Sequence, residues 1–238
     1  MSRHSHWAKI KRGKGSADVD RGALFSKHAR LVTVAAREGG GDPAFNFKLR
    51  LAVDRAKGDG MPKDAIERAI ARGAGGASGE IIETVLYEGI APGGAGVLVE
   101  CLTDNRNRAL GAVKTVFTKQ GGTLGGEGSV RWQFTRRGVL TIPGSLSEEQ
   151  ELVLIDGGAE DIQRGDEEVT VFTATDALAR VREGAERAGL TIADAGLEWV
   201  PKQRVDVPDG QREQFESFLS ALDGLDDTQE VYTNAAGY

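Results

Sequence analysis

The sequence predicts an α+β multidomain protein, with an N-terminal helical domain followed by two α/β sandwich domains, one inserted in the other. Apolar residues recur at helical spacing up to a glycine-rich linker at residues 73–79, after which strand-like runs of branched residues alternate with helical patterns. A second pattern of this kind interrupts the first, which indicates an insertion. The predicted domains are residues 1–78, residues 80–134 plus 206–238, and residues 135–205. Two consecutive α+β domains remain the alternative.

Three helices are predicted in the first domain. The first covers residues 23–38, carries His28 on its apolar stripe and ends at a run of three glycines. We expect Asp42 to cap the second helix, with Pro43 at its first position. The third helix is expected to begin near Pro62 and to end at Gly73.

The second domain begins with two strands and a helix, predicted at residues 81–90, 96–103 and 105–120. The segment SVRWQF alternates and predicts a strand with Val130, Trp132 and Phe134 pointing inward. The same domain is completed near the C-terminus by a helix after Asp209 and a short strand that contains TQEVYTN.

The inserted domain reads βαβαβ in its predicted elements. Its first helix is opened by Ser147, with Gln150 three residues later, the spacing of a capping box. Strands are expected at residues 138–143, 167–172 and about 191–200, and a second helix at about 178–188.

Charge is divided unevenly along the chain. The net charge is −6, yet residues 1–78 hold 16 Lys and Arg against 8 Asp and Glu, whereas the remainder holds 14 against 28. This asymmetry predicts a polyanion-binding portion carried on an acidic body. The alternative is a basic helical domain that docks on its own acidic neighbour.

The sequence offers no catalytic or metal-binding constellation. Cys101, the single cysteine, lies in an apolar strand, which favours a buried, inert thiol and excludes a disulfide within the chain. The three histidines, His4, His6 and His28, have no cysteine or carboxylate partners at metal-ligand spacing. Neither a G-x-S-x-G motif nor a P-loop occurs, and no apolar run is long enough to span a membrane. We therefore expect no enzymatic activity, no metal, no cofactor and no membrane insertion.

Basic residues are the candidates for binding. The N-terminal stretch HSHWAKIKRGKG is expected to form a mobile arm that meets phosphate, with Trp7 either stacking on a base or pinning the arm to the helical domain. The third helix exposes further cations, and the segment TDNRNR places two arginines at a helix start, where amides and the helix dipole favour anions. Local capping by Asp104 or Asn105 is the alternative there. The candidate nucleic-acid-binding residues are Arg3, His4, His6, Trp7, Lys9, Lys11, Arg12, Lys14, Arg21, Lys63, Arg68, Arg72, Arg106 and Arg108.

Several long motifs resemble the YebC/PmpR family, in order and over essentially the whole chain. They are HSHWAKIK, GGGDPAFNFKLRLAV, MPKDAIERAIARG, YEGIAPGGAGVLVECLTDNRNR, FTKQGGTLGGEGSVRWQF and ALDGLDDTQEVYTN. The resemblance implies three domains around a cleft. It also implies a bacterial cytoplasmic protein without an organelle presequence, because the match begins at residue 2. Arg3, His6 and Phe47 depart from the usual Gly, Lys and Pro, which weakens any assignment of contacts at these positions.

The resemblance implies a non-enzymatic regulator, since family members are commonly described as DNA-binding transcriptional regulators. Others are regarded as ribosome-associated translation factors that ease difficult peptide synthesis, such as proline runs, and the family includes a mitochondrial translational activator. We expect duplex DNA as partner, with ribosomal RNA as the alternative. The sequence does not distinguish a monomer from a weak dimer.

Overall fold

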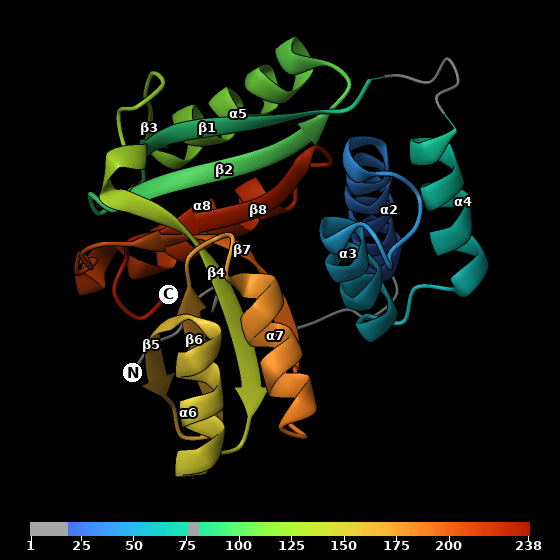
Figure 1. The fold of residues 1–238 in the computed structure, drawn as a ribbon. Coiled ribbons are helices and arrows are strands. Elements are labelled where there is room, and N and C mark those ends of the chain that lie inside the picture. Colours follow the sequence, from blue (N-terminus) through green and yellow to red (C-terminus); the bar gives the residue numbers. More distant parts are fainter. Residues whose placement is uncertain (1–18, 76–80) are drawn as a thin grey trace. The chain divides into compact units, whose positions relative to one another are not determined.

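The computed structural model describes residues 19–75 and 81–238, and it divides into two compact units. One unit is Thr135–Val200; the other comprises the described residues before it together with Pro201–Tyr238. The expected α+β class is confirmed: three helices precede two four-stranded sheets, each with helices packed on it (Figure 1).

The helical region consists of α2 (Val19–Gly39), α3 (Phe47–Gly58) and α4 (Lys63–Ala74). Its core is formed by fully or nearly fully buried aliphatic side chains, among them Val32, Leu49, Val53 and Ile66. Gly73 lies inside α4 instead of ending it, and a Cβ there would lie 2.2 Å from the Thr33 carbonyl oxygen of α2. The expected end at Gly73 is wrong by one residue, and this glycine serves the close approach of two helices.

The expected cap of the second helix is also wrong. Asn46 is the N-cap of α3, its side chain accepting a hydrogen bond from the Leu49 amide at 3.1 Å. Asp42 instead holds the turn that precedes the helix, where its carboxylate accepts from the Ala44 amide at 2.9 Å. Asx residues form such turns as readily as they form caps, and the sequence does not distinguish the two roles.

The first sheet has the strand order β3-β1-β2-β8, and every neighbouring pair is antiparallel. Its strands are β1 (Glu83–Ile90), β2 (Gly96–Thr103), β3 (Thr123–Leu124) and β8 (Thr228–Thr233). Helices α5 (Arg106–Gln120) and α8 (Arg212–Asp223) pack together through the edge-to-face rings of Phe117 and Phe218, 4.9 Å apart. Both rings belong to one core with Val97, Val99 and Cys101 of β2.

The segment expected to form a strand with Val130, Trp132 and Phe134 inward is different in the structure, although Val130 and Phe134 are buried as expected. Arg131–Gln133 is a 3-10 helix, and 67% of Trp132 is exposed. Glu88 of β1 holds this segment, because its carboxylate accepts backbone hydrogen bonds at 2.7–2.8 Å from Gly128, Val130 and Arg131. A carboxylate about 40 residues earlier in the chain thus overrides the local alternation.

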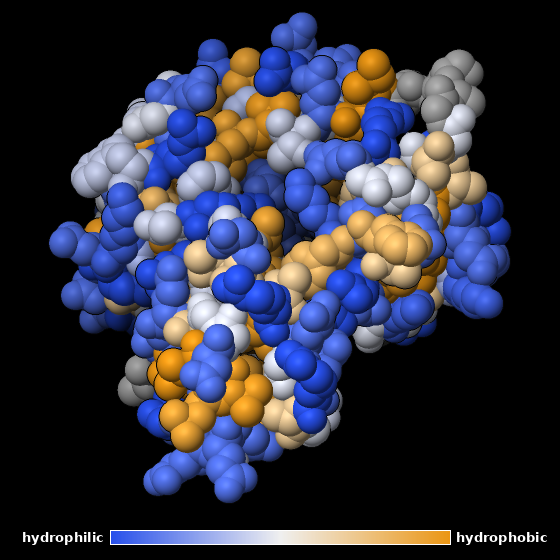
Figure 2. Space-filling model, in the orientation of Figure 1, coloured by the Kyte–Doolittle hydropathy of each residue, from blue (hydrophilic) through white to orange (hydrophobic). Residues whose placement is uncertain are grey.

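The second unit contains a sheet with the strand order β5-β6-β4-β7, in which β6 is antiparallel to β4 and β5. Its elements are β4 (Phe134–Pro143), α6 (Glu148–Gly157), β5 (Ala159–Arg164), β6 (Glu168–Thr173), α7 (Leu178–Arg187) and β7 (Asp194–Pro201). The predicted capping box of Ser147 and Gln150 is confirmed, whereas β5 was not expected. Leu152 and Ile155 of α6 are exposed, and Figure 2 shows an apolar surface low in the view, where Figure 1 places this helix.

Candidate nucleic-acid interface

The candidates of the N-terminal arm lie outside the described residues. These are Arg3, His4, His6, Trp7, Lys9, Lys11, Arg12 and Lys14. The other six candidates, Arg21, Lys63, Arg68, Arg72, Arg106 and Arg108, all lie in one unit, on α2, α4 and α5.

Helix α4 presents its three candidate cations to solvent, and Figure 2 shows a hydrophilic surface over it. Lys63 lies 3.5 Å from Glu67, and Arg68 lies 2.7 Å from Asp64, each four residues apart on the helix. The hydrogen bond from Arg68 lowers the pKa of Asp64. Exposed pairs of this kind contribute little to stability and exchange readily with other ions. Their cations therefore remain available to an external phosphate.

More basic than acidic side chains are exposed on the helical region. The exposed cations are Arg21, Arg37, Lys48, Lys57, Lys63, Arg68 and Arg72, and the exposed anions are Glu38, Asp42, Asp64 and Glu67. The described part of this region thus has a positive surface, and the sequence that precedes it carries further basic residues.

Other basic residues of the helical region are used inside the protein. Lys27 of α2 donates to the carbonyl and the carboxylate of Asp223 at 2.8 and 3.0 Å. Arg55 of α3 lies 3.1 Å from Glu230 of β8. For these two residues the docking alternative is right, because they pair with acids of the adjoining sheet domain. The basic surface available to bind a polyanion is correspondingly smaller than the number of Lys and Arg residues suggests.

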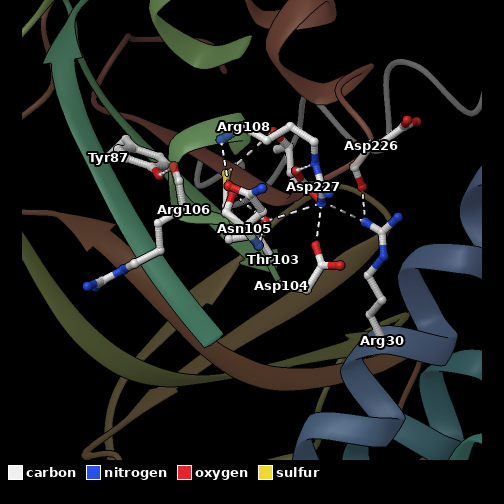
Figure 3. Close-up of polar contacts among 11 residues, drawn as sticks. Arg30, Tyr87, Thr103, Asp104, Asn105, Arg106, Arg108, Asp226 and Asp227 are labelled. Atoms are coloured by element: carbon white, nitrogen blue, oxygen red, sulfur yellow. Dashed lines mark hydrogen bonds and ion pairs between the residues drawn. The ribbon is translucent and has the colours of Figure 1, made fainter. Parts of the chain in front are cut away.

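Arg108 is the centre of a carboxylate network (Figure 3). Its Nε and Nη2 donate to the two carboxylate oxygens of Asp227 at 3.0 and 2.8 Å, and Nη2 also donates to Asp104 at 2.5 Å. Arg30 of α2 approaches the same Asp227 carboxylate at 3.9 Å and donates to the Asp226 carbonyl. The hydrogen bonds that Arg108 donates to Asp227 and then to Asp104 raise the pKa of its guanidinium. Its charge is compensated locally, so the capping alternative accounts for Arg108 better than a free phosphate contact.

Arg106 lies at the first position of α5, directly after the N-cap Asn105. Its side chain is 67% exposed and pairs with Glu83 at 3.2 Å, while its carbonyl accepts from the Tyr87 hydroxyl. Arg106 also lines a hollow of about 420 Å³ beside β1, together with Arg131. This hollow brings together two exposed arginines from distant parts of the sequence.

The role of Glu88 was not visible in the sequence, where it is one acid within a strand. Only 2% of the residue is exposed, and burial would raise its pKa, but the three backbone amides outweigh burial and lower it. The one feature of the sequence that could have indicated this role is a carboxylate in an apolar strand near a glycine-rich loop.

The remaining chemistry of the described residues is sparse. Cys101 is fully buried, and burial raises the pKa of its thiol to about 11. Within residues 19–75 and 81–238, no group of three His, Cys, Asp or Glu side chains is arranged to hold a metal ion. In the same residues, no helix combines the length and apolarity needed to cross a membrane.

Comparison with known proteins identifies two matching family models. Residues 5–76 match the TACO1/YebC protein N-terminal domain, and residues 82–235 match the TACO1/YebC second and third domain. The chain belongs to the TACO1/YebC family. The family boundary at residues 77–81 falls between α4 and β1, where the helical region ends.

Relatives of this YebC-family protein span nearly its whole length. A protein of Thermomicrobium roseum is 46% identical, covering 99% of this chain and 96% of the relative, and one of Desulfosudis oleivorans is 44% identical, covering 99% and 97%. Both are named "Probable transcriptional regulatory protein". The crystal structure of a conserved hypothetical protein from Aquifex aeolicus superposes with a TM-score of 0.86 at 44% identity, covering 97% of this chain and 96% of the other.

Proposed function

We propose that this protein is a non-enzymatic, nucleic-acid-binding regulatory protein that holds phosphates with its helical region and N-terminal arm. The observation that carries the proposal is the excess of exposed cations on α2, α3 and α4, which remains after Lys27 and Arg55 are paired internally. Mobile counterions around nucleic acid are released when such cations neutralise phosphates, and this release supplies affinity without fixed geometry.

Transcriptional regulation on duplex DNA in the cytoplasm is the form of this function that the names of the relatives favour. In this proposal the arm residues and Arg21 contact phosphates, and Lys63, Arg68 and Arg72 extend the contact along α4. Arg106 adds an exposed cation at the start of α5. Arg108 contributes by ordering that helix start through Asp227 instead of touching the nucleic acid.

A ribosome-associated translation factor that binds ribosomal RNA, and eases stalls such as those at proline runs, is the second candidate. One observation favours it: α4 has the sequence KDAIERAIARGA, without the Asn or Gln that reads adenine in the major groove. The exposed Lys63 and Arg68 of this helix are each paired with an acid of the same helix. Binding by charge and shape suits RNA more than a sequence-specific groove contact does.

Salt-titrated binding distinguishes the two candidates. The full chain is titrated with random duplex DNA, with promoter fragments selected for binding, and with purified ribosomes in co-sedimentation. A transcriptional regulator should prefer one DNA sequence over random duplex by at least about 10³ at physiological salt. Equal affinity for all duplexes, with co-sedimentation on ribosomes, would exclude the regulator and support the translation factor. A protein that binds neither polymer would contradict the proposal as a whole.

A further inference from the structure

Phe45 is the most exposed large apolar side chain of the described residues, with 89% of its surface in solvent. It lies in the turn that joins α2 to α3 (Figure 1). Within residues 21–75 no other large apolar residue is exposed. A stable protein–protein interface needs a large contiguous apolar patch, and one exposed aromatic ring beside the small Pro43 and Ala44 and the half-buried Phe47 does not provide one.

The turn that carries Phe45 is tightly held. The Phe45 amide donates a hydrogen bond to the Asp42 carbonyl at 3.1 Å. The next residue, Asn46, is buried and donates from its side-chain amide to the carbonyls of Ala35 and Gly40 at 2.7 and 2.8 Å. The ring is therefore presented to solvent from a backbone that is already ordered, which reduces the entropy lost when a ligand stacks on it.

The surroundings of the ring suit a phosphate. Helix α3 begins two residues later without an acid in its first turn, and Lys48 lies in that turn. Lys48 pairs with Glu38 at 2.8 Å, and both side chains are about half exposed or more, at 61% and 49%. A Cβ on Gly41 of the same turn would lie 2.8 Å from the Cβ of Ala74, which places the end of α4 beside this turn.

We infer that Phe45 is a stacking platform for an unpaired nucleobase, with the adjoining phosphate held by Lys48 and the first amides of α3. The inference rests on the proposed nucleic-acid binding and specifies its ligand. A benzyl ring offers a flat apolar face to any base, but bases within a continuous duplex have both faces covered. The ligand is therefore a loop, bulge or melted strand of RNA or DNA.

The test uses fluorescence anisotropy with three fluorescent probes: an RNA hairpin with a single-stranded loop, a fully paired RNA duplex with the same number of phosphates, and a single-stranded DNA of the loop sequence. Phe45→Ala should weaken binding of the hairpin roughly 5- to 100-fold, the range expected when base–aromatic stacking is removed, and should leave binding of the duplex unchanged. Phe45→Trp should retain hairpin binding. Ile81→Ala removes another exposed apolar side chain, 70% exposed, and should have no effect.

Salt dependence separates stacking from charge. Phe45→Ala should keep the slope of log K against log salt, whereas Lys48→Ala should reduce it by about 0.7 for a single-stranded contact. A 2-aminopurine placed in the loop should be quenched by the unaltered protein and not by Phe45→Ala. The single-stranded DNA probe shows whether stacking extends to DNA: binding weakened by Phe45→Ala assigns it to both polymers, and no weakening assigns it to RNA.

Four results would overturn the inference. If the unaltered protein binds the hairpin and Phe45→Ala binds it equally well, the stacking role fails and the proposed function stands. Equal weakening on hairpin and duplex would exclude an unpaired base as the ligand. Loss of self-association in Phe45→Ala by sedimentation, with unchanged hairpin binding, would assign Phe45 to a protein contact. If the unaltered protein binds no nucleic acid, both the inference and the proposed function fail.

Discussion

Glu88→Gln should destabilise the sheet domain and release the segment that carries Arg131 and Trp132. In the native protein one carboxylate oxygen accepts from Gly128 and the other from both Val130 and Arg131. An amide can keep only one acceptor oxygen, so its NH₂ group faces a backbone donor. At least one of the three bonds is lost, and the others become neutral instead of charge-assisted.

The magnitude follows from these bonds. Leaving one amide unpaired costs about 1–3 kcal/mol, and each bond that loses its charge costs about 1 kcal/mol more. Because two of the three hydrogen bonds, those from Gly128 and Arg131, are only partly buried, we expect a total loss of about 2–4 kcal/mol in the free energy of unfolding. The melting temperature should fall by roughly 5–15 °C in calorimetry.

The matched control is Glu127→Gln, in the same loop, where the side chain is 85% exposed and lies 3.9 Å from Arg131. It should change stability by less than about 0.5 kcal/mol. The pKa of Glu88 is lowered in the folded protein, so its contribution is fully present above the unfolded pKa of about 4.3 and is lost as pH falls through the folded value. The Glu88→Gln deficit should therefore shrink in acid. A Glu88→Gln protein as stable as Glu127→Gln at pH 7 would refute the reasoning.

Three further predictions concern the packing of α4, the burial of Cys101 and the two arginines at the start of α5. Gly73→Ala should lower the free energy of unfolding in urea by about 1–3 kcal/mol, because the new Cβ would meet a carbonyl of α2. Gly111→Ala, with open space around it in α5, should raise the same free energy by about 0.5–1 kcal/mol. Equal effects of the two substitutions would contradict the packing of α4 on α2. Cys101, with its pKa raised to about 11, should react with a thiol reagent at pH 8 only after unfolding, and rapid native labelling would disprove its burial. Arg106→Glu should weaken nucleic-acid binding at unchanged melting temperature, whereas Arg108→Glu should lower the melting temperature; the reverse pattern would reassign the two arginines.

Periodicity and capping signals predicted most of the fold. Strand β2 was expected at residues 96–103 and is found there, and the capping box at Ser147 is present. The wrong expectations have different causes. Glu88, a distant group, holds the segment of Trp132 and leaves this side chain exposed. The cap of α3 is Asn46 instead of Asp42, two Asx residues between which the sequence does not distinguish. The strand β5 has a weak apolar pattern, with mostly exposed or half-buried side chains, and was missed for that reason.

The candidate interface was predictable only in part. The basic composition of the first 78 residues is a property of the sequence, but which cations remain available depends on the tertiary structure. Lys27 and Arg55 pair with acids more than 170 residues away, and Arg108 with Asp227, 119 residues later. Phe45 resembles any apolar residue of a helical segment until the turn and its exposure are known. The local sequence therefore predicts the sign of the surface charge, and tertiary packing determines which basic residues remain available for binding.

The slope of log K against log salt for duplex DNA tests the central claim most directly. It should be measured for the unaltered chain and for a variant in which Lys9, Lys11, Arg12 and Lys14 are replaced by Ala. If the basic arm and helical region hold phosphates, the variant should bind more weakly, with a slope reduced by about 0.9 for each phosphate that is no longer neutralised. Unchanged affinity and an unchanged slope would contradict the claim that the arm binds phosphate.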